Sequence, residues 1–183
     1  MHPDIQRVLI SEVRIRRRVA ELGREISTVH AGHEALLIAV LRGAAIFAAD
    51  LIRHIEIPTV LDFMAISSYG DSTRSSGVVQ ILKDVEESIA GRRVILVEDI
   101  VDTGLTSTYL ARLLAERQPE RVEVCALLDK PARRRTEARL DYRGFTIPDE
   151  YVVGYGLDYR QRYRGLPYVG TLKPEALKRG TSA

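Results

Sequence analysis

Residues 94–108 read VILVEDIVDTGLTST, from Val94 to Thr108. The run begins with four apolar residues, which predict a strand buried on both faces of a sheet. The chain turns polar at Glu98 and Asp99, and the pattern from Gly104 to Arg117 predicts a helix. This stretch therefore predicts a strand and a helix, with adjacent carboxylates where the buried strand ends.

Strands and helices alternate along the rest of the chain. Apolar runs predict strands at residues 5–10, 35–41, 59–66, 78–82 and 122–128. Ser11 is a suitable helix N-cap, and the helix after it has a core stripe formed by Ile15, Val19, Leu22, Ile26 and Val29. A further helix is predicted from Ala44 to Ile55. The alternation indicates an α/β fold with a mostly parallel sheet flanked by helices, and the short β-like pieces of 143–172 indicate a small cap.

The composition is that of a globular protein. Of the 183 residues, 45% are hydrophobic and 28% are charged, so we expect a single domain over 1–183. The net charge of +2 gives no electrostatic case for a nucleic-acid or membrane partner, and the Arg runs 16–18 and 133–135 are interpreted as solvated surface. No segment approaches the ~20 apolar residues of a membrane span. Cys125 is the only cysteine, which excludes an internal disulfide and favours a reducing compartment, so we expect a cytoplasmic protein.

The acids after the predicted strand indicate a ligand site. Carboxylates beside an apolar core are costly unless they bind cations, hydroxyls or amides, and α/β proteins bind ligands at the carboxyl ends of parallel strands. Residues 102–108 bring Gly, Thr and Ser to a helix N-terminus, where free N–H groups and the helix dipole favour a phosphate. Together these features predict a sugar phosphate. In the structural alternative, Asp102 only caps the helix, and Glu98 and Asp99 lie in solvent.

The segment from Glu98 to Gly104 resembles the 5-phosphoribosyl-1-diphosphate (PRPP) binding motif of type I phosphoribosyltransferases, in which acids follow a buried strand and precede a Thr/Ser/Gly loop. Further segments are similar, in order and spacing, to the hypoxanthine (hypoxanthine-guanine) phosphoribosyltransferases: Leu41-Arg42-Gly43, Ser68-Tyr69, and Lys130 together with residues 151–159. The resemblance covers the chain from Ile5 to about Gly170. It implies the type I phosphoribosyltransferase fold, with a cap built from the terminal segments.

The resemblance assigns the residues that bind the ribose and its phosphate. Glu98 and Asp99 would bind the ribose 2′- and 3′-hydroxyls. The 5′-phosphate would be bound by Asp102, Thr103, Gly104, Leu105 and Thr106. Asp102 would also lie near N7 of the purine as the general base, with a plain helix cap as the alternative. Leu105 stands where some relatives carry Lys, and we expect this difference to be tolerated, because backbone amides do most of the binding at a helix N-terminus.

The resemblance assigns the binding of the diphosphate and of a metal ion to a second group of residues. The diphosphate would be bound by Arg42, Gly43 and Arg164. A Mg²⁺ ion would be held by Glu98, Asp99 and Asp158, with waters and phosphate oxygens completing its ligands. Arg42 stands where many relatives carry Lys, which keeps the charge but replaces a point charge with a fork of donors. A cis peptide bond between Leu41 and Arg42 is implied as well.

The purine is assigned to Lys130, Tyr151, Val152 and Asp158. Lys130 follows an apolar strand, and as a cation with donors and no acceptor it suits the 6-oxo group of a purine and rejects the 6-amino group of adenine. Tyr151 corresponds to the aromatic residue that stacks on the base, and the backbone of Val152 to the group that reads the purine edge. In isolation, Lys130 would be interpreted as an exposed lysine and Tyr151 as a core residue.

Residues 67–77 are poor in apolar residues and rich in breakers, which predicts a loop. By resemblance this loop, with Ser68 and Tyr69, is a flexible lid that closes over the site and keeps water from an oxocarbenium-like state. A connector without function is the alternative. The tail 173–183 is short and charged, and no function is assigned to it.

The resemblance implies a Mg²⁺-dependent hypoxanthine phosphoribosyltransferase of purine salvage, which converts hypoxanthine and PRPP into inosine monophosphate and diphosphate and takes guanine as a second substrate. It also implies a homodimer or homotetramer. Two rivals stay open: a pyrimidine or xanthine enzyme on the same fold, and a PRPP-sensing regulator that binds RNA or DNA without turnover. The near-zero net charge and the presence of Lys130, Tyr151 and Asp158 argue against the regulator.

Overall fold

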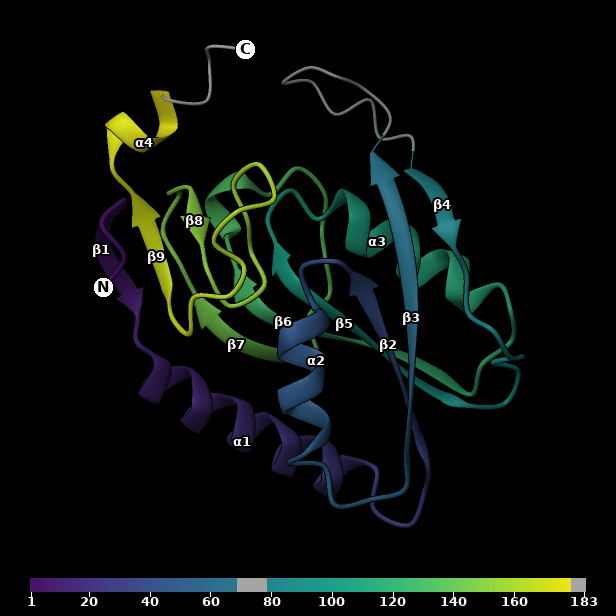
Figure 1. The fold of residues 1–183 in the computed structure, drawn as a ribbon. Helices are drawn as coiled ribbons and strands as arrows, with labels where there is room; N and C mark the ends of the chain where they lie inside the picture. Colours follow the sequence, from purple (N-terminus) through teal and green to yellow (C-terminus); the bar gives the residue numbers. More distant parts are fainter. Residues whose placement is uncertain (69–78, 179–183) are drawn as a thin grey trace.

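A six-stranded sheet in the order β4-β3-β2-β5-β6-β7 forms the centre of the fold (Figure 1). The structure, a computed structural model, describes residues 1–68 and 79–178. The strands of this sheet are β2 (Ala35–Leu41), β3 (Thr59–Ser68), β4 (Val79–Lys83), β5 (Arg93–Val101), β6 (Arg121–Asp129) and β7 (Tyr142–Thr146). Neighbouring strands are parallel except for β3 and β4. The predicted mostly parallel sheet is confirmed.

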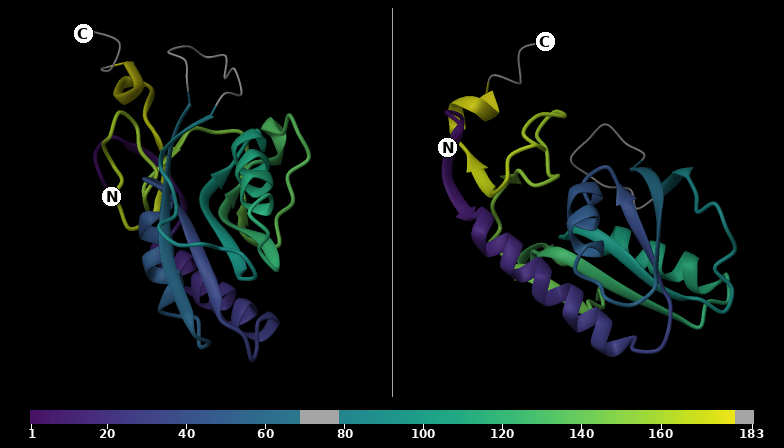
Figure 2. Two further views of the ribbon diagram at one scale, coloured as in Figure 1. Left: turned by 90° about the vertical axis from the view of Figure 1, so that its right-hand side faces the viewer. Right: turned by 60° about the horizontal axis from the view of Figure 1, so that its bottom comes forward.

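Helices cover both faces of this sheet. α1 (Glu12–Val29) and α2 (Ala45–Ile52) lie on one face and α3 (Leu105–Ala115) on the other, as the left view of Figure 2 shows. Alternate residues of β5 explain this arrangement, because Ile95 and Val97 pack with α1 and α2, whereas Val94 and Leu96 pack with α3. A strand that is buried on both faces needs the uninterrupted apolar sequence that β2 and β5 have.

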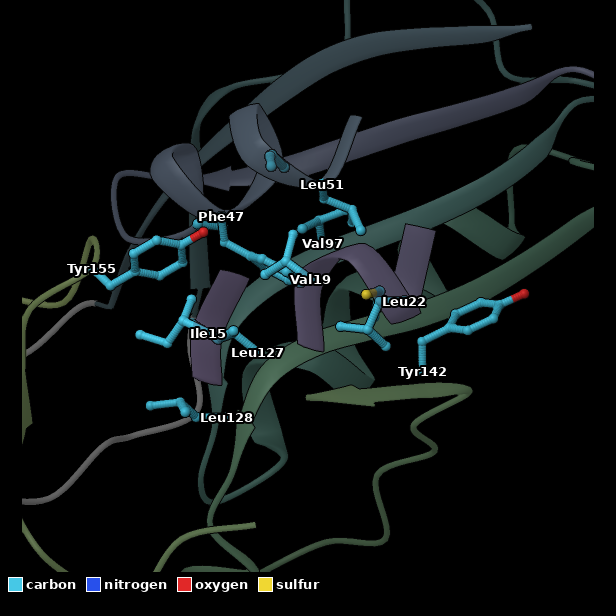
Figure 3. Close-up of a cluster of buried hydrophobic side chains, with 14 of the residues drawn as sticks. Ile15, Val19, Leu22, Phe47, Leu51, Val97, Leu127, Leu128, Tyr142 and Tyr155 are labelled. Carbon is cyan, nitrogen blue, oxygen red and sulfur yellow. The ribbon is translucent and has the colours of Figure 1, made fainter. Parts of the chain in front are cut away.

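The larger core lies between the sheet and the pair α1 and α2 (Figure 3). The predicted stripe of α1 is confirmed at Ile15, Val19, Leu22 and Ile26, which are all buried. Val29 was expected in the same stripe but is 47% exposed, because it ends the helix and faces a surface groove.

A second sheet brings the two ends of the chain together. β1 (Ile5–Ile10), β9 (Val169–Leu172) and β8 (Val152–Val153) pair antiparallel in the order β1-β9-β8, and α4 (Pro174–Lys178) follows β9. This sheet confirms the predicted cap. β7 departs from that prediction, because it pairs with β6 as the edge strand of the main sheet. Within the described residues, no helix is long and apolar enough to cross a membrane.

The predicted end of β5 was wrong. The strand continues through Glu98 and Asp99 to Val101, because its pairing with β6 extends to the pair of Val101 with Asp129. The two acids therefore lie within the last part of the strand and not after it. Pairing with β6 on one side holds this part of the strand more firmly than a loop would, whereas its pairing with β2 ends at Val97.

The helix boundaries also differ from the predicted ones. α2 ends at Ile52 and not at residue 55, and a turn in which His54 N–H donates to the Leu51 carbonyl follows it. α3 starts at Leu105, because Gly104 is its N-cap and takes a left-handed φ of 80°, outside the helical region. Ser11 is the N-cap of α1, but its side chain makes no capping hydrogen bond within the described chain.

The carboxyl ends of β2, β5 and β6 meet at one edge of the sheet, since the three strands are parallel. The N–H of Lys130 donates to the carbonyl of Val101 at 2.9 Å and joins the ends of β5 and β6 directly. Of the predicted lid at 67–77, Ser67 and Ser68 belong to β3, and the remainder, Tyr69 included, lies outside the described residues.

Candidate active site

A cleft of about 270 Å³ opens at this edge of the sheet. Residues from the end of β2, from β5, from the loop before α3 and from the segment after β8 line it. The predicted site residues among them are Gly43, Glu98, Asp99, Asp102, Gly104, Thr106, Asp158 and Arg164. The fold therefore brings together residues that are more than a hundred positions apart in the chain.

Glu98 of β5 is buried, and its neighbour Asp99 is half-buried within the influence of the Arg164 charge. Glu98 is 5% exposed, and its Oε1 has no hydrogen-bond partner within the described residues. Burial, reinforced by the charges of Asp99 and Asp102, raises the pKa of Glu98 well above its usual range. Burial also raises the pKa of Asp99 to about 6, although its Oδ1 accepts the N–H of Ile100 at 2.8 Å. Carboxylates in this state are suited to bind a cation or sugar hydroxyls.

The donor set fits a magnesium ion. Carboxylate oxygens are hard ligands, and no hydrogen bond within the described residues competes for Oε1 of Glu98. Asp158 is held in place at the other side of the cleft, because its Oδ1 lies 2.8 Å from Nη2 of Arg164 and its Oδ2 accepts the N–H of Gln161. Within the described residues no three His, Cys, Asp or Glu side chains converge on one point, so substrate or water oxygens would have to complete the ligands.

The loop between β5 and α3 has the geometry of an anion site. Gly104 turns the backbone into the first turn of α3, and the Asp102 carboxylate accepts the N–H of Thr103. A Cβ atom on Gly104 would lie 2.8 Å from the carbonyl oxygen of Thr136, so glycine is required for both conformation and space. The N-terminus of α3 points its free N–H groups and its dipole toward the cleft end of this loop.

Arg134 supports the loop between β5 and α3, and the sequence analysis did not identify it. The run 133–135 was interpreted as solvated surface, but the side chain of Arg134 is 20% exposed and its Nη1 donates to the carbonyl of Asp102 at 3.1 Å. Its Nη2 pairs with the carboxylate of Asp129, which is 3% exposed and ends β6. Arg134 therefore connects the phosphate loop to the strand that precedes Lys130. No signal in the sequence distinguishes Arg134 from its exposed neighbours.

Of the predicted purine residues, Asp158 lines the cleft, Lys130 directly follows β6, and Tyr151 and Val152 lie at the start of β8. Lys130 is 5% exposed, and its Nζ donates to the carbonyl of Glu150 at 2.7 Å. Burial lowers its pKa. Tyr151 is 53% exposed, its hydroxyl donates to the carbonyl of Asp158, and its ring meets Tyr159 edge to face. Val152 is buried in β8. The interpretation of Lys130 as an exposed lysine is wrong, because Lys130 is buried, and that of Tyr151 as a core residue is wrong, because Tyr151 is exposed.

The predicted diphosphate residues lie at the mouth of the cleft. The peptide bond between Leu41 and Arg42 is cis, as predicted. Nη1 of Arg42 and Nη2 of Arg164 both donate to Oε1 of Gln161, at 2.9 and 3.0 Å. Sequence reasoning missed Gln161. Gly43 packs between the carboxylate of Asp99 and the backbone of Gly156.

Comparisons of the sequence agree on one family. The phosphoribosyl transferase domain family matches residues 10–160. The hypoxanthine-guanine phosphoribosyltransferase of Bacillus subtilis is 49% identical over 174 residues, which cover 95% of this chain and 97% of that protein. The bifunctional protein TilS/HprT of Listeria monocytogenes is 50% identical over 175 residues, which cover 96% of this chain. The chain spans only 27% of the length of that bifunctional relative.

Solved structures have the same fold. A hypoxanthine phosphoribosyltransferase from Staphylococcus aureus superposes with a TM-score of 0.93 at 45% identity, covering 96% of each chain. The hypoxanthine phosphoribosyl transferase of Trypanosoma cruzi gives a TM-score of 0.94 at 36% identity, covering 100% of this chain and 99% of that chain. The family and the fold that the motifs indicated are confirmed. The chain therefore belongs to the phosphoribosyl transferase family, among the hypoxanthine-guanine phosphoribosyltransferases.

Proposed function

We propose that this chain transfers the 5-phosphoribosyl group of PRPP to hypoxanthine, with guanine as a second substrate, and releases diphosphate in a step of purine salvage. The placement of buried acids, a phosphate loop and a buried lysine at one edge of the sheet carries this proposal. The relatives named for the same reaction support it.

PRPP lies with its ribose on β5 and its 5′-phosphate on the loop before α3. The hydroxyls of the ribose donate to Glu98 and Asp99 and so satisfy Oε1 of Glu98, which has no hydrogen-bond partner in the part of the chain that the structure describes. The 5′-phosphate lies on the loop from Asp102 to Thr106 and accepts backbone N–H groups at the start of α3, whereas the N–H of Thr103 stays on the Asp102 carboxylate. The Thr side chains of this loop add hydroxyl donors.

The reaction replaces diphosphate by a purine nitrogen at C1 of the ribose. Positive charge develops on the ribose while diphosphate leaves, so the carboxylates of β5 and the guanidiniums of Arg42 and Arg164 stabilise opposite ends of the same charge separation. Asp102 removes one proton from the base. No covalent nucleophile is needed, because positioning and charge neutralisation lower the barrier.

A magnesium ion, when bound, neutralises part of the diphosphate charge. Glu98, Asp99 and Asp158 are the side chains that would hold it or its waters. Asp158 is kept in its place by Arg164 and by the backbone of Gln161.

Lys130 selects the base. Its Nζ uses one donor on the Glu150 carbonyl and keeps others for the 6-oxo group of the purine. The 6-amino group of adenine offers no acceptor at this point. An N–H of the buried Lys130 ammonium would then stay unpaired, which costs binding energy. The exposed ring of Tyr151 supplies the stacking surface for the base.

The test is product formation from PRPP and magnesium with hypoxanthine, guanine, xanthine, adenine and uracil in parallel. We expect turnover of hypoxanthine and guanine and refusal of adenine and uracil. Lys130→Ala should raise the KM for hypoxanthine by about tenfold or more and leave the KM for PRPP nearly unchanged. Lys173→Ala, an exposed lysine of the cap, is the matched control. If the protein turns over xanthine or uracil in preference to hypoxanthine, the substrate is a different base from the one proposed.

The rival regulator predicts a different result in the same assay. PRPP would bind, no base would react, and RNA or DNA would be retarded in a salt-dependent gel shift. A closing lid at Tyr69 stays a prediction, and unchanged turnover in Tyr69→Ala would contradict it. A homodimer or homotetramer likewise stays a prediction that sedimentation equilibrium measures.

A further inference from the structure

Gln161 occupies a shared position between two cations at the mouth of the cleft. Its Oε1 accepts Nη1 of Arg42 at 2.9 Å and Nη2 of Arg164 at 3.0 Å. Arg42 follows β2, and Arg164 follows β8. Arg42 is exposed, and among the described residues its guanidinium hydrogen-bonds to Gln161, which directs it toward Arg164.

The backbone presents Gln161 in an unusual conformation. Residues 159–162 form a tight turn in which Tyr159 and Arg162 exchange backbone hydrogen bonds of 3.2 and 3.1 Å. The two central residues, Arg160 and Gln161, have φ values of 53° and 63°, in the left-handed region. Gly or Asn adopts this region at lower cost than Gln does. The turn is nevertheless held in place, because the N–H of Gln161 donates to Oδ2 of Asp158 at 2.7 Å.

A neutral amide is suited to this position for an electrostatic reason. The two guanidiniums repel each other, and an acceptor between them offsets that repulsion. A carboxylate would do so more strongly, but it would also cancel charge that an incoming polyanion needs. The amide oxygen of Gln161 can accept from both cations and leaves the net charge of the site unchanged.

The bonds to Gln161 do not exhaust the donors of either cation. Arg42 uses Nη1, and Arg164 uses Nη1 for the carbonyl of Gly156 and Nη2 for Gln161 and Asp158. The remaining N–H groups of Arg42 are available to a ligand in the cleft. Gln161 therefore orients the pair without competing for all of its donors.

We propose that Gln161 is a positioning residue for diphosphate recognition: its amide oxygen holds Arg42 and Arg164 together in the arrangement that binds the diphosphate group. The inference rests on the proposed function, in which these arginines bind the diphosphate of PRPP. Gln161 acts through the two arginines, as a positioning residue, and does not touch the reacting atoms.

Three variants separate the effects of side-chain length, side-chain charge and left-handed backbone conformation. Gln161→Asn keeps the amide and suits the left-handed backbone better, but it is one methylene shorter and cannot bridge both cations. Gln161→Glu keeps the length and adds a negative charge. Gln118→Asn is the matched control, because Gln118 is an exposed glutamine with a left-handed φ of 59° at the end of α3, remote from the cleft.

The measurement is calorimetric binding of inorganic diphosphate in the presence of magnesium, without any base, followed by steady-state kinetics. We expect Gln161→Asn to weaken diphosphate binding about fivefold, the ratio that corresponds to one ordinary hydrogen bond. Gln161→Glu should weaken it by at least as much, and Gln118→Asn should stay within about twofold. The KM for PRPP should rise in parallel, with the KM for hypoxanthine unchanged.

Wild-type affinity in Gln161→Asn or in Gln161→Glu would overturn the proposal, and so would tighter binding, which would mean that Gln161 competes with the ligand. An equal rise of both KM values would also overturn it, because that is the effect of a general structural defect. The binding readout does not depend on turnover. If wild-type protein binds diphosphate but converts no base, the proposed function fails while the role of Gln161 is still decided.

Discussion

A Cβ atom on Gly43 would overlap Oδ2 of Asp99. The loop after β2 thus passes so close to the acids of β5 that only a hydrogen atom fits between them. On its other side, the carbonyl of Gly43 meets Gly156 equally closely, since a Cβ atom on Gly156 would overlap that oxygen. The loop after β2, the acids of β5 and the segment at Gly156 are therefore built as one packed unit.

Gly43→Ala should reduce kcat/KM for PRPP by about a hundredfold or more, because the methyl group must displace either the Asp99 carboxylate or the Arg42 loop, and misplacement of about 1 Å has this effect. Steady-state kinetics measure the loss. Gly165→Ala is the matched control, because a Cβ atom there meets nothing within 4 Å. Equal activity in the two variants would contradict the close packing.

Glu98→Gln should make the protein more stable and less able to bind PRPP. Glu98 is buried with no ion pair among the described residues and its pKa is raised, so keeping its charge or taking up a proton on folding costs free energy that the amide does not. We expect a gain of ~1–2 kcal/mol in the absence of PRPP and magnesium, which is a few degrees in Tm. Thermal unfolding measures it, with the exposed Glu56→Gln as control. A lower Tm than that of the wild type would contradict the argument.

Asp102→Asn should lower kcat more than it raises the KM for PRPP. The variant keeps an oxygen that can accept the N–H of Thr103, so the phosphate loop keeps its shape. It loses the base that takes the proton of the purine, a loss of ~10²–10⁴ in kcat. Steady-state kinetics with both substrates varied separate the two effects. Equal losses in kcat and PRPP affinity would mean that Asp102 only supports the loop.

Local sequence signals predicted which residues lie together at this edge of the sheet. An apolar run, adjacent acids and a Gly/Thr loop are all within residues 94–108, and the structure places them on β5 and at the start of α3. The boundary of β5 was missed, because strand length depends on pairing with β6, which is a contact with a distant segment.

Gln161 and Arg134 could not be predicted for the same physical reason. Gln161 bonds to Arg42 across a separation of 119 residues, and Arg134 bonds to Asp102 across 32 residues. Polar side chains in irregular segments have no periodicity, and their roles exist only in the folded chain. Sequence patterns therefore indicate which residues bind a ligand more readily than which residues position them.

A buried polar cluster of His30, Glu123 and Tyr142 lies at the opposite end of the sheet. His30 is fully buried after α1, with its Nε2 2.7 Å from Oε2 of Glu123 and 3.2 Å from the hydroxyl of Tyr142. Arg121 pairs with Oε1 of Glu123 at 2.8 Å. Nδ1 of His30 has no hydrogen-bond partner within the described residues. Burial lowers the pKa of His30, although Glu123 opposes the shift.

A lowered pKa in the folded state means that the unfolded chain binds more protons below the ordinary histidine pKa of ~6.5. Stability that His30 contributes is therefore complete above that pH and is lost as the pH falls, by at most about 1.4 kcal/mol per pH unit. Denaturant unfolding of the wild type from pH 8 to pH 5 measures this loss. NMR titration of the ring should give a pKa below the ordinary histidine value of ~6.5.

His30→Leu removes the titrating group from this cluster. The variant should be less stable than the wild type at pH 8, because Glu123 keeps only Arg121 and Tyr142, but its stability should fall less between pH 7 and pH 5. His33→Leu is the control, because His33 is exposed and should leave the pH dependence unchanged. If the fall in stability is the same in all three proteins, other groups cause it, and the buried ring of His30 is not the pH-sensitive element.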